Sequence, residues 1–258
     1  MASQMNKNIL VTGGASGIGF AIAEYLGKQG NHVIIADLNG DAANSAANKL
    51  KEQSISASAI EINVADSAAI ASLPEKLADT PVDVLVNNAG IQHVSRLEDF
   101  PADKWSLLIQ VMLVGPAMLT RALLPTMKER GYGRIINVGS IHSLVASPYK
   151  SAYVAAKHGL LGFAKTLALE TGDVDVTINT LCPSYVKTPL VEKQIASQAK
   201  EHGLSEEEVV NKIMLEPMPK KAFIGLDELA ETAAFLMSNA ARNITGQTIV
   251  LDGGWTAR

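Results

Sequence analysis

Short hydrophobic runs alternate along this chain with longer stretches rich in Ala, Leu, Glu and Lys. The runs predict seven β-strands, at Asn8–Thr12, His32–Asp37, Ser56–Val64, Val82–Asn87, Arg134–Ser140, Thr177–Cys182 and Gln247–Asp252. The stretches between them predict helices, among them Gly17–Gln29, Asp41–Gln53 and Ser151–Thr171. Strands that alternate with helices form parallel sheets covered on both faces. The pattern therefore predicts one doubly wound α/β domain over residues 1–258, with a ligand cleft at the carboxyl ends of its strands.

One polar segment interrupts this alternation. Residues Lys187–Lys221 contain two helix-like stretches and close on Glu216-Pro217-Met218-Pro219. A connection of this length inside a compact domain usually has a function of its own. We predict that 187–221 is a mobile lid over a substrate site; the alternative is a solvated excursion without a role.

Composition narrows the class of protein. The chain has 258 residues, of which 47% are hydrophobic and 19% charged, which is enough for a large core and excludes a disordered chain. The net charge of −4 and the lack of a long basic run argue against nucleic-acid binding. A single cysteine, Cys182, excludes a disulfide framework and a multi-cysteine metal site, so we expect no metal.

Two further features bear on localisation. The N-terminus lacks the basic, apolar and small-residue succession of a signal peptide. The most apolar stretch, Leu107–Met127, is interrupted by Gln110, Pro116 and Arg121, so we expect a buried helix or a subunit interface rather than a membrane span. Together these features predict a soluble cytoplasmic protein.

A glycine-rich motif follows the first predicted strand and opens the first predicted helix. It reads Thr12-Gly13-Gly14-Ala15-Ser16-Gly17-Ile18-Gly19, a spacing that differs from Gly-x-Gly-x-x-Gly. Glycines let the backbone turn tightly and approach a pyrophosphate, whose charge is stabilised by the helix N-terminus. The motif predicts a Rossmann-type dinucleotide site. The candidate contacts are Gly13, Ser16, Gly17, Ile18 and Gly19.

Asp37 ends the second predicted strand, 18 residues after Gly19. A carboxylate at this place can accept both hydroxyls of the adenosine ribose and repel a 2′-phosphate. Neither Leu38 nor Asn39 offers a cation for such a phosphate. We therefore predict NAD rather than NADP as the cofactor, although Asp37 could also be an ordinary turn residue.

Tyr153 and Lys157 are spaced i,i+4 on a predicted helix and so share one face. A nearby ammonium stabilises phenolate, so we expect Lys157 to lower the pKa of Tyr153. A tyrosine tuned in this way can take the proton of an alcohol while hydride leaves for a nicotinamide. Ser140, 13 residues earlier, could hydrogen-bond the same oxygen.

These motifs together resemble the short-chain dehydrogenase/reductase family. The resemblance rests on Thr12–Gly19, Asn87-Asn88-Ala89-Gly90, Ser140, Tyr153 with Lys157, and the closing Asp252-Gly253-Gly254, and it covers essentially the whole chain. It implies that Tyr153 is the catalytic base, that Lys157 lowers its pKa and binds the nicotinamide ribose, and that Ser140 positions the substrate oxygen. It also implies further cofactor contacts at Asn63, Val64, Asn88, Ala89, Gly90, Pro183, Val186 and Thr188. A homotetramer, packed through helices such as Gly115–Arg130 and Ser151–Thr171, is implied as well.

Within that family the chain is most similar to the members that interconvert D-3-hydroxybutyrate and acetoacetate with NAD. The similarity is carried by residues 89–94, 140–147, 150–159 and 188–194 and by the ending Asp252-Gly253-Gly254-Trp255. It implies that the substrate carboxylate is held by Gln92, His142, Lys150 and Gln194. The chemistry agrees, because a small 3-hydroxy acid has little apolar area and must be oriented through its carboxylate. We assign His93 and His158 to structure.

Two positions depart from the family pattern. Met112 stands where the family usually has a catalytic Asn that helps to hold a water in the proton relay, and a thioether accepts hydrogen bonds only weakly. Asn63 stands where many members have Asp beside the adenine. Two alternatives therefore stay open: a reductase of another substrate, such as a 3-oxoacyl thioester or a sugar, and a non-catalytic dinucleotide-binding sensor. Asp37 and Lys150 argue against the first alternative, and the Ser140, Tyr153 and Lys157 set argues against the second.

Overall fold

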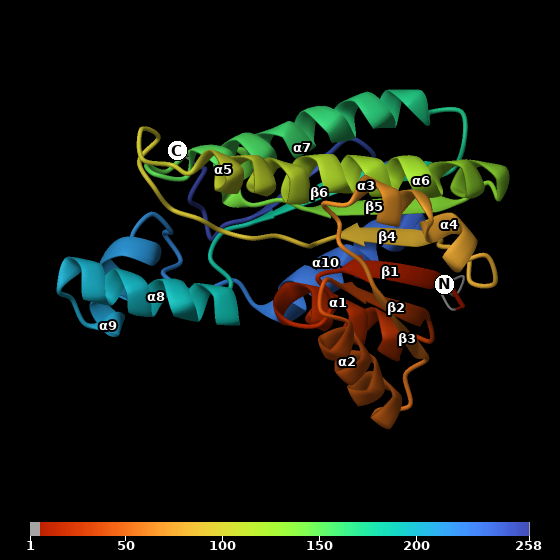
Figure 1. Ribbon diagram of the computed structural model, residues 1–258, viewed down its shortest axis with the longest axis horizontal. Helices are drawn as coiled ribbons and strands as arrows, with labels where there is room; N and C mark the ends of the chain where they lie inside the picture. The colour runs from red at the N-terminus through yellow and green to blue at the C-terminus, as the bar shows by residue number, and fades with distance from the viewer. Residues whose placement is uncertain (1–5, 258) are drawn as a thin grey trace.

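The computed structural model describes residues 6–257, which form a seven-stranded parallel sheet with helices on both faces (Figure 1). The strand order is β3-β2-β1-β4-β5-β6-β7. The strands are β1 Asn8–Thr12, β2 His32–Asp37, β3 Ala57–Glu61, β4 Val84–Asn87, β5 Gly133–Val138, β6 Val176–Pro183 and β7 Thr248–Leu251. The order changes direction at β1, between β2 and β4, as in a Rossmann-type doubly wound sheet. The predicted fold class is confirmed.

Two helical layers cover the sheet. The helices are α1 Gly17–Lys28, α2 Gly40–Glu52, α3 Ser67–Ala71, α4 Leu73–Lys76, α5 Ala102–Ile109, α6 Gly115–Glu129, α7 Ser151–Glu170, α8 Pro189–His202, α9 Glu206–Val209 and α10 Leu226–Met237. Helices α1, α2 and α10 share one core cluster, whereas α3, α4, α6 and α7 share the other. Alternate β1 residues enter opposite clusters, Ile9 and Val11 on one side and Leu10 on the other, because side chains of a strand alternate between faces.

The predicted strands are all present, but three of them end earlier than predicted. The third ends at Glu61 rather than Val64, the fifth at Val138 rather than Ser140, and the seventh at Leu251 rather than Asp252. Ser140 instead caps a short 3₁₀ turn, Ile141–Ser143. The hydrophobic pattern continues past the third strand because Ile62 and Val64 stay buried.

Helices α5 and α6 run on into each other through a π-helical turn at Gln110–Val114. The joined helix, Ala102–Glu129, is long and apolar enough to cross a membrane by length and composition, a test that core helices of globular proteins also pass. Of its most apolar window, 44% is buried inside the structure. Sequence periodicity did not indicate the π-turn, which is a feature often found at functional sites.

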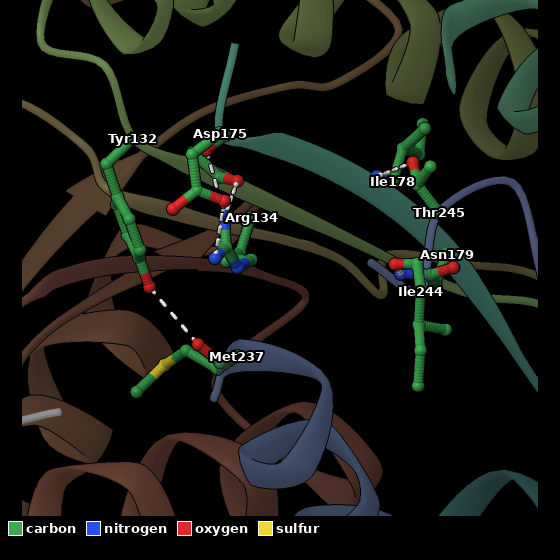
Figure 2. Close-up of polar contacts among 9 residues, drawn as sticks. Tyr132, Arg134, Asp175, Ile178, Asn179, Met237, Ile244 and Thr245 are labelled. Atoms are coloured by element: carbon green, nitrogen blue, oxygen red, sulfur yellow. Dashed lines mark hydrogen bonds and ion pairs between the residues drawn. The ribbon is translucent and has the colours of Figure 1, made fainter. Parts of the chain in front are cut away.

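A polar network lies at the amino end of β5, at the opposite end of this strand from the cleft (Figure 2). The Arg134 guanidinium is fully buried; its Nη1 donates to the carbonyl oxygens of Gly133 and Asp175, both at 2.9 Å, and its Nη2 lies 2.8 Å from Asp175 Oδ1. The Tyr132 hydroxyl donates to the Met237 carbonyl at 3.2 Å. The network therefore ties β5, the start of β6 and the end of α10 together without contributing to the cleft.

The segment 187–221 forms α8, α9 and a π-turn at Val210–Met214, which confirms its two helical stretches. A parallel bridge between Val186 and Ile224 closes its base, and Ile224 N donates to Tyr185 O at 2.9 Å. Helices α8 and α9 lie together beside the body of the molecule (Figure 1). The segment thus leaves and rejoins the domain at one point, and its role as a mobile lid stays a prediction.

Candidate active site

A cavity of about 470 Å³ opens at the carboxyl ends of the strands. Its wall includes nearly all the predicted cofactor residues: Gly13, Ser16, Gly17, Ile18, Asp37, Asn63, Val64, Asn88, Ala89, Gly90, Tyr153, Lys157, Pro183, Val186 and Thr188. These residues come from loops that follow β1 to β6, so a parallel sheet is what gathers them. Of the predicted cofactor residues, Gly19 does not line the cavity.

The glycine loop is built for close backbone approach. Gly13 and Gly17 have φ of 59° and 57°, in the left-handed region that favours glycine. A Cβ at Gly19 would lie 2.5 Å from Asn88 Nδ2, which explains a glycine at a position away from the cavity. Asn88 Nδ2 donates to the carbonyl oxygens of Thr12 and Gly13, at 2.9 and 3.1 Å. The Asn88 side chain therefore supports the loop, a role that the sequence reading did not assign.

Asp37 is held at the end of β2 by the loop itself. Its Oδ2 accepts from Ala15 N at 3.3 Å, and its Oδ1 accepts from Asn39 N at 3.2 Å. Across the same part of the cavity, Asn63 Oδ1 accepts from Ala65 N at 2.9 Å. In the cavity wall, hydrogen bonds from backbone N–H groups thus fix the Asp37 carboxylate and the side-chain amide of Asn63.

Ser140, Tyr153 and Lys157 meet on the opposite wall. Tyr153 and Lys157 project from the first turns of α7, and Ser140 caps the short turn that follows β5. Ser140 and Tyr153 line the same cavity. Lys157 Nζ donates to the Val138 carbonyl at 2.6 Å and lies 5.7 Å from the centre of the Tyr153 ring. The i,i+4 spacing therefore does bring the two side chains together.

The expected effect of Lys157 on Tyr153 was wrong for this structure. Burial raises the pKa of Tyr153 above its ordinary value of 10.0, and the hydrogen bond from Ser140 offsets this only in part. Burial also lowers the pKa of Lys157 to about 8. The lysine therefore remains mostly protonated at neutral pH, while the phenol stays neutral.

A second, smaller cavity of about 90 Å³ adjoins the first. It brings together the four predicted carboxylate ligands, Gln92, His142, Lys150 and Gln194, with Ser140 and Tyr153. Gln194 comes from α8, so the 187–221 segment contributes to this pocket. Sequence reasoning missed Tyr185 and Val191, which also line it. The only available signal was their place beside predicted contacts such as Val186 and Thr188.

Charge is arranged unusually in this small pocket. Lys150 is only 9% exposed, burial lowers its pKa, and no carboxylate of the described residues forms an ion pair with it. Burial also lowers the pKa of His142 to about 4, so its ring is neutral at pH 7. His142 Nε2 lies 2.7 Å from Ser147 Oγ, whereas Nδ1 has only a 3.5 Å contact with Ser140 Oγ. The small pocket thus combines the cationic side chain of Lys150 with the neutral side chains of Gln92, His142 and Gln194.

Met112 lies on the wall of the larger cavity, in the π-turn, and is 1% exposed. It packs against Leu108, Ala152 and Ala156, with Tyr153 at the edge of the same cluster. The position that departs from the family pattern is therefore at the site and is apolar. His93 packs on Phe100 and His158 contacts Val154 O, so neither lines the two cavities.

The residues present fit a nicotinamide dinucleotide. A Cβ at Gly13 would come within 3.0 Å of Ala89 Cα, so a glycine is needed there. Because this residue lines the cavity without a side chain, a ligand can approach the loop backbone closely. Ser16 N-caps α1, and that helix terminus can stabilise a pyrophosphate. The cavity runs from Asp37, the predicted ribose-binding carboxylate, to Lys157.

The fold and the two cavities define an oxidoreductase of the Rossmann class. The chain belongs to the short-chain dehydrogenase family, whose family description "short chain dehydrogenase" matches residues 7–199. It is 44% identical to the D-beta-hydroxybutyrate dehydrogenase of Rhizobium meliloti, over 98% of this chain and 100% of that protein. It is 43% identical to the protein of the same name from Cupriavidus necator, over 98% of both chains. A 3-oxoacyl-[acyl-carrier-protein] reductase of Chlamydia trachomatis is 33% identical over 97% of each chain.

Proposed function

We propose that this protein interconverts D-3-hydroxybutyrate and acetoacetate with NAD. The observation that carries the proposal is the buried Lys150 side chain, which has no carboxylate partner among the described residues and lies in a pocket beside Tyr153. A buried charge without a partner is costly, so such a group indicates that a ligand supplies the counter-charge. A substrate carboxylate would do so, and the likeness to two D-beta-hydroxybutyrate dehydrogenases supports this choice.

The size of the pocket supports a small acid. Its volume of about 90 Å³ and its four carboxylate-binding side chains leave an apolar remainder formed by Ile141, Tyr185 and Val191. Gln92, His142 and Gln194 can each donate a hydrogen bond to a carboxylate oxygen, while Lys150 adds charge. Such a set orients the hydroxyl-bearing carbon toward Tyr153 and Ser140.

The proton chemistry is assigned to Tyr153. In the reduction direction its neutral phenol donates a proton to the carbonyl oxygen of the substrate, and its raised pKa keeps that proton available. In the oxidation direction Tyr153 must first lose its own proton, so that the phenolate can take the hydroxyl proton of the substrate, and the positive charge of Lys157 favours that form. Ser140 holds the substrate oxygen beside the phenol. The dinucleotide supplies the hydride acceptor and donor when bound.

The choice of NAD rests on Asp37. Its carboxylate lines the cavity at the place where an adenosine ribose would lie, and both its oxygens are held by backbone N–H groups. A fixed carboxylate accepts the ribose hydroxyls and repels a 2′-phosphate. The neighbouring Leu38 is 67% exposed and carries no charge that could attract such a phosphate.

The test is the absorbance at 340 nm when the protein is mixed with D-3-hydroxybutyrate and NAD. We expect NADH to form with the D-acid and NAD, and little to form with L-3-hydroxybutyrate or NADP. Tyr153→Phe should abolish turnover while NAD binding, measured by calorimetry, stays intact. Turnover of a 3-oxoacyl thioester with NADPH, without turnover of the acid, would instead support the reductase alternative.

We also propose that the protein is a homotetramer that acts in the cytoplasm. Helices α6 and α7 offer apolar surface that the subunit itself does not cover, including Leu169, which is 86% exposed. Light scattering at micromolar concentration tests the assembly, and a mass of one subunit, 27.3 kDa, would contradict it.

A further inference from the structure

Trp255, close to the C-terminus, packs on two of the three aromatic rings that line the small pocket, those of His142 and Tyr185. Its ring stacks on Tyr185, with centroids 6.1 Å apart and planes at 24°. It meets the His142 ring edge to face, at 6.2 Å and 79°. Trp255 itself does not line the small pocket. It faces an outer cavity of about 490 Å³, which it lines with Leu144, Val145, Glu216, Pro217 and Thr256.

The backbone around Trp255 is fixed by contacts that do not involve its ring. The Asp252 carboxylate accepts from Gly254 N at 2.8 Å, and from Thr256 N and Oγ1, both at 2.7 Å. Gly253 and Gly254 have φ of 60° and 91°, which a side chain would oppose. The resulting turn presents Trp255 at a set position.

The same turn is anchored to the base of the 187–221 segment. Lys220 N donates to Gly253 O at 3.1 Å, and a Cβ on Gly253 or Gly254 would press on Met218 or Pro219. Trp255 also packs against the cluster that contains Leu215 and Met218. The tail therefore connects the 187–221 segment with the side chains of the small pocket.

His142 depends on Trp255 for its orientation. Its ring is held by the Ser147 contact, by an edge-to-face contact with Tyr153 at 6.0 Å, and by Trp255. Trp255 is the one of these three that lies between His142 and the outer cavity. Without it, the His142 and Tyr185 rings would border open space and gain rotamer freedom.

We propose that Trp255 is a positioning residue for substrate binding, which acts through His142 and Tyr185 and does not touch the substrate. This role rests on the proposed function. This role differs from that of the four side chains that bind the substrate carboxylate, because Trp255 keeps the pocket side chains in position and does not bind the charge of the substrate. A pocket whose walls are already ordered binds a small acid with a smaller loss of entropy.

The test compares Trp255→Ala with Trp255→Phe. We expect the alanine variant to raise the KM for D-3-hydroxybutyrate about tenfold, as two lost aromatic contacts imply, with a much smaller change in kcat. The KM for NAD should not change, since Trp255 does not line the larger cavity. Trp255→Phe retains a ring and should recover most of the affinity. If the alanine variant is unstable, Trp255→Leu keeps the apolar volume and gives the same comparison.

A mutant cycle separates this role from a general effect on stability. If Trp255 acts through His142 and Tyr185, then Trp255→Ala adds less than about twofold to KM in a background in which both of these residues are alanine. A full, additive loss in that background would overturn the proposal.

Fluorescence supplies a second readout. The chain has two tryptophans, so Trp105→Phe leaves Trp255 as the only emitter. Acetoacetate added to the NAD complex cannot react, and we expect it to change the Trp255 emission at saturating acid. No change in emission would overturn the proposal.

The two hypotheses fail in different ways. Normal turnover of the wild-type protein together with an unchanged KM in Trp255→Ala would overturn the positioning role alone. Absence of D-3-hydroxybutyrate oxidation by the wild-type protein would overturn the proposed function, and this role with it.

Discussion

Lys150→Met should separate substrate binding from stability. Lys150 stands at the N-cap position of α7; the residue is 9% exposed and has no carboxylate partner among the described residues. Methionine keeps the length and the packing of the side chain but removes the charge. A hydrogen bond to a charged group contributes about 1.5 to 3 kcal/mol, so we expect the KM for D-3-hydroxybutyrate to rise roughly 10- to 150-fold.

The effect of the same change on stability should have the opposite sign. Burial lowers the pKa of Lys150 below its ordinary value of 10.5, so the folded state carries a desolvation cost whenever the ammonium is charged. That cost is fully present at a pH below the folded pKa. It disappears as the pH rises through the unfolded value. Lys150→Met should therefore melt at the same or a higher temperature than the wild type at pH 7.

Steady-state kinetics and calorimetry at pH 7 measure the two effects. Lys165→Met is the matched control, because Lys165 is an exposed lysine on the same helix, and neither KM nor melting temperature should change. An unchanged KM in Lys150→Met would refute the carboxylate clamp. A clear fall in melting temperature would refute the view that this charge is buried for binding at the expense of stability.

Three further predictions concern the cofactor site, Met112 and the polar network around Arg134. Asp37→Ala should raise the KM for NAD about tenfold or more and relax discrimination against NADP; an unchanged NAD/NADP ratio would contradict its role. Met112→Asn should lower the melting temperature, because it buries an amide in an apolar cluster, and should leave kcat unraised, since Lys157 already has a direct carbonyl partner. A large rise in kcat would show that the proton relay is compromised. Arg134→Ala should cost about 3 to 5 kcal/mol in denaturant unfolding while kcat stays normal, and a loss of kcat in folded protein would contradict the separation of this network from the site.

Much of the site was predictable because its chemistry is local in sequence. The glycine loop, Asp37 and the Tyr153–Lys157 pair each lie at a strand end or a helix start, and parallel strands bring such ends to one edge. Residues that act from a distance were not predictable. Tyr185 carries no motif of its own, and nothing in the closing segment indicates that Trp255 meets Tyr185: 70 residues separate them, although their rings stack.

Electrostatics were the least predictable part. From spacing alone, Lys157 should lower the pKa of Tyr153, but burial in the folded protein raises it, and burial is a property of the whole cavity wall. The π-turn that carries Met112 also has no signature in the hydrophobic pattern, since α-helical and π-helical turns bury similar side chains.

The sequence by itself determined the class of fold, the cleft and the candidate residues that line it, because alternation, glycine placement and i,i+4 spacing follow from local geometry. Only the tertiary structure decided that Asn88 supports the glycine loop, that Gly19 is needed for packing, and that Lys150 is a buried, unpaired cation. These depend on which distant segments meet and how much water they exclude, and neither quantity can be read from the order of residues along the chain.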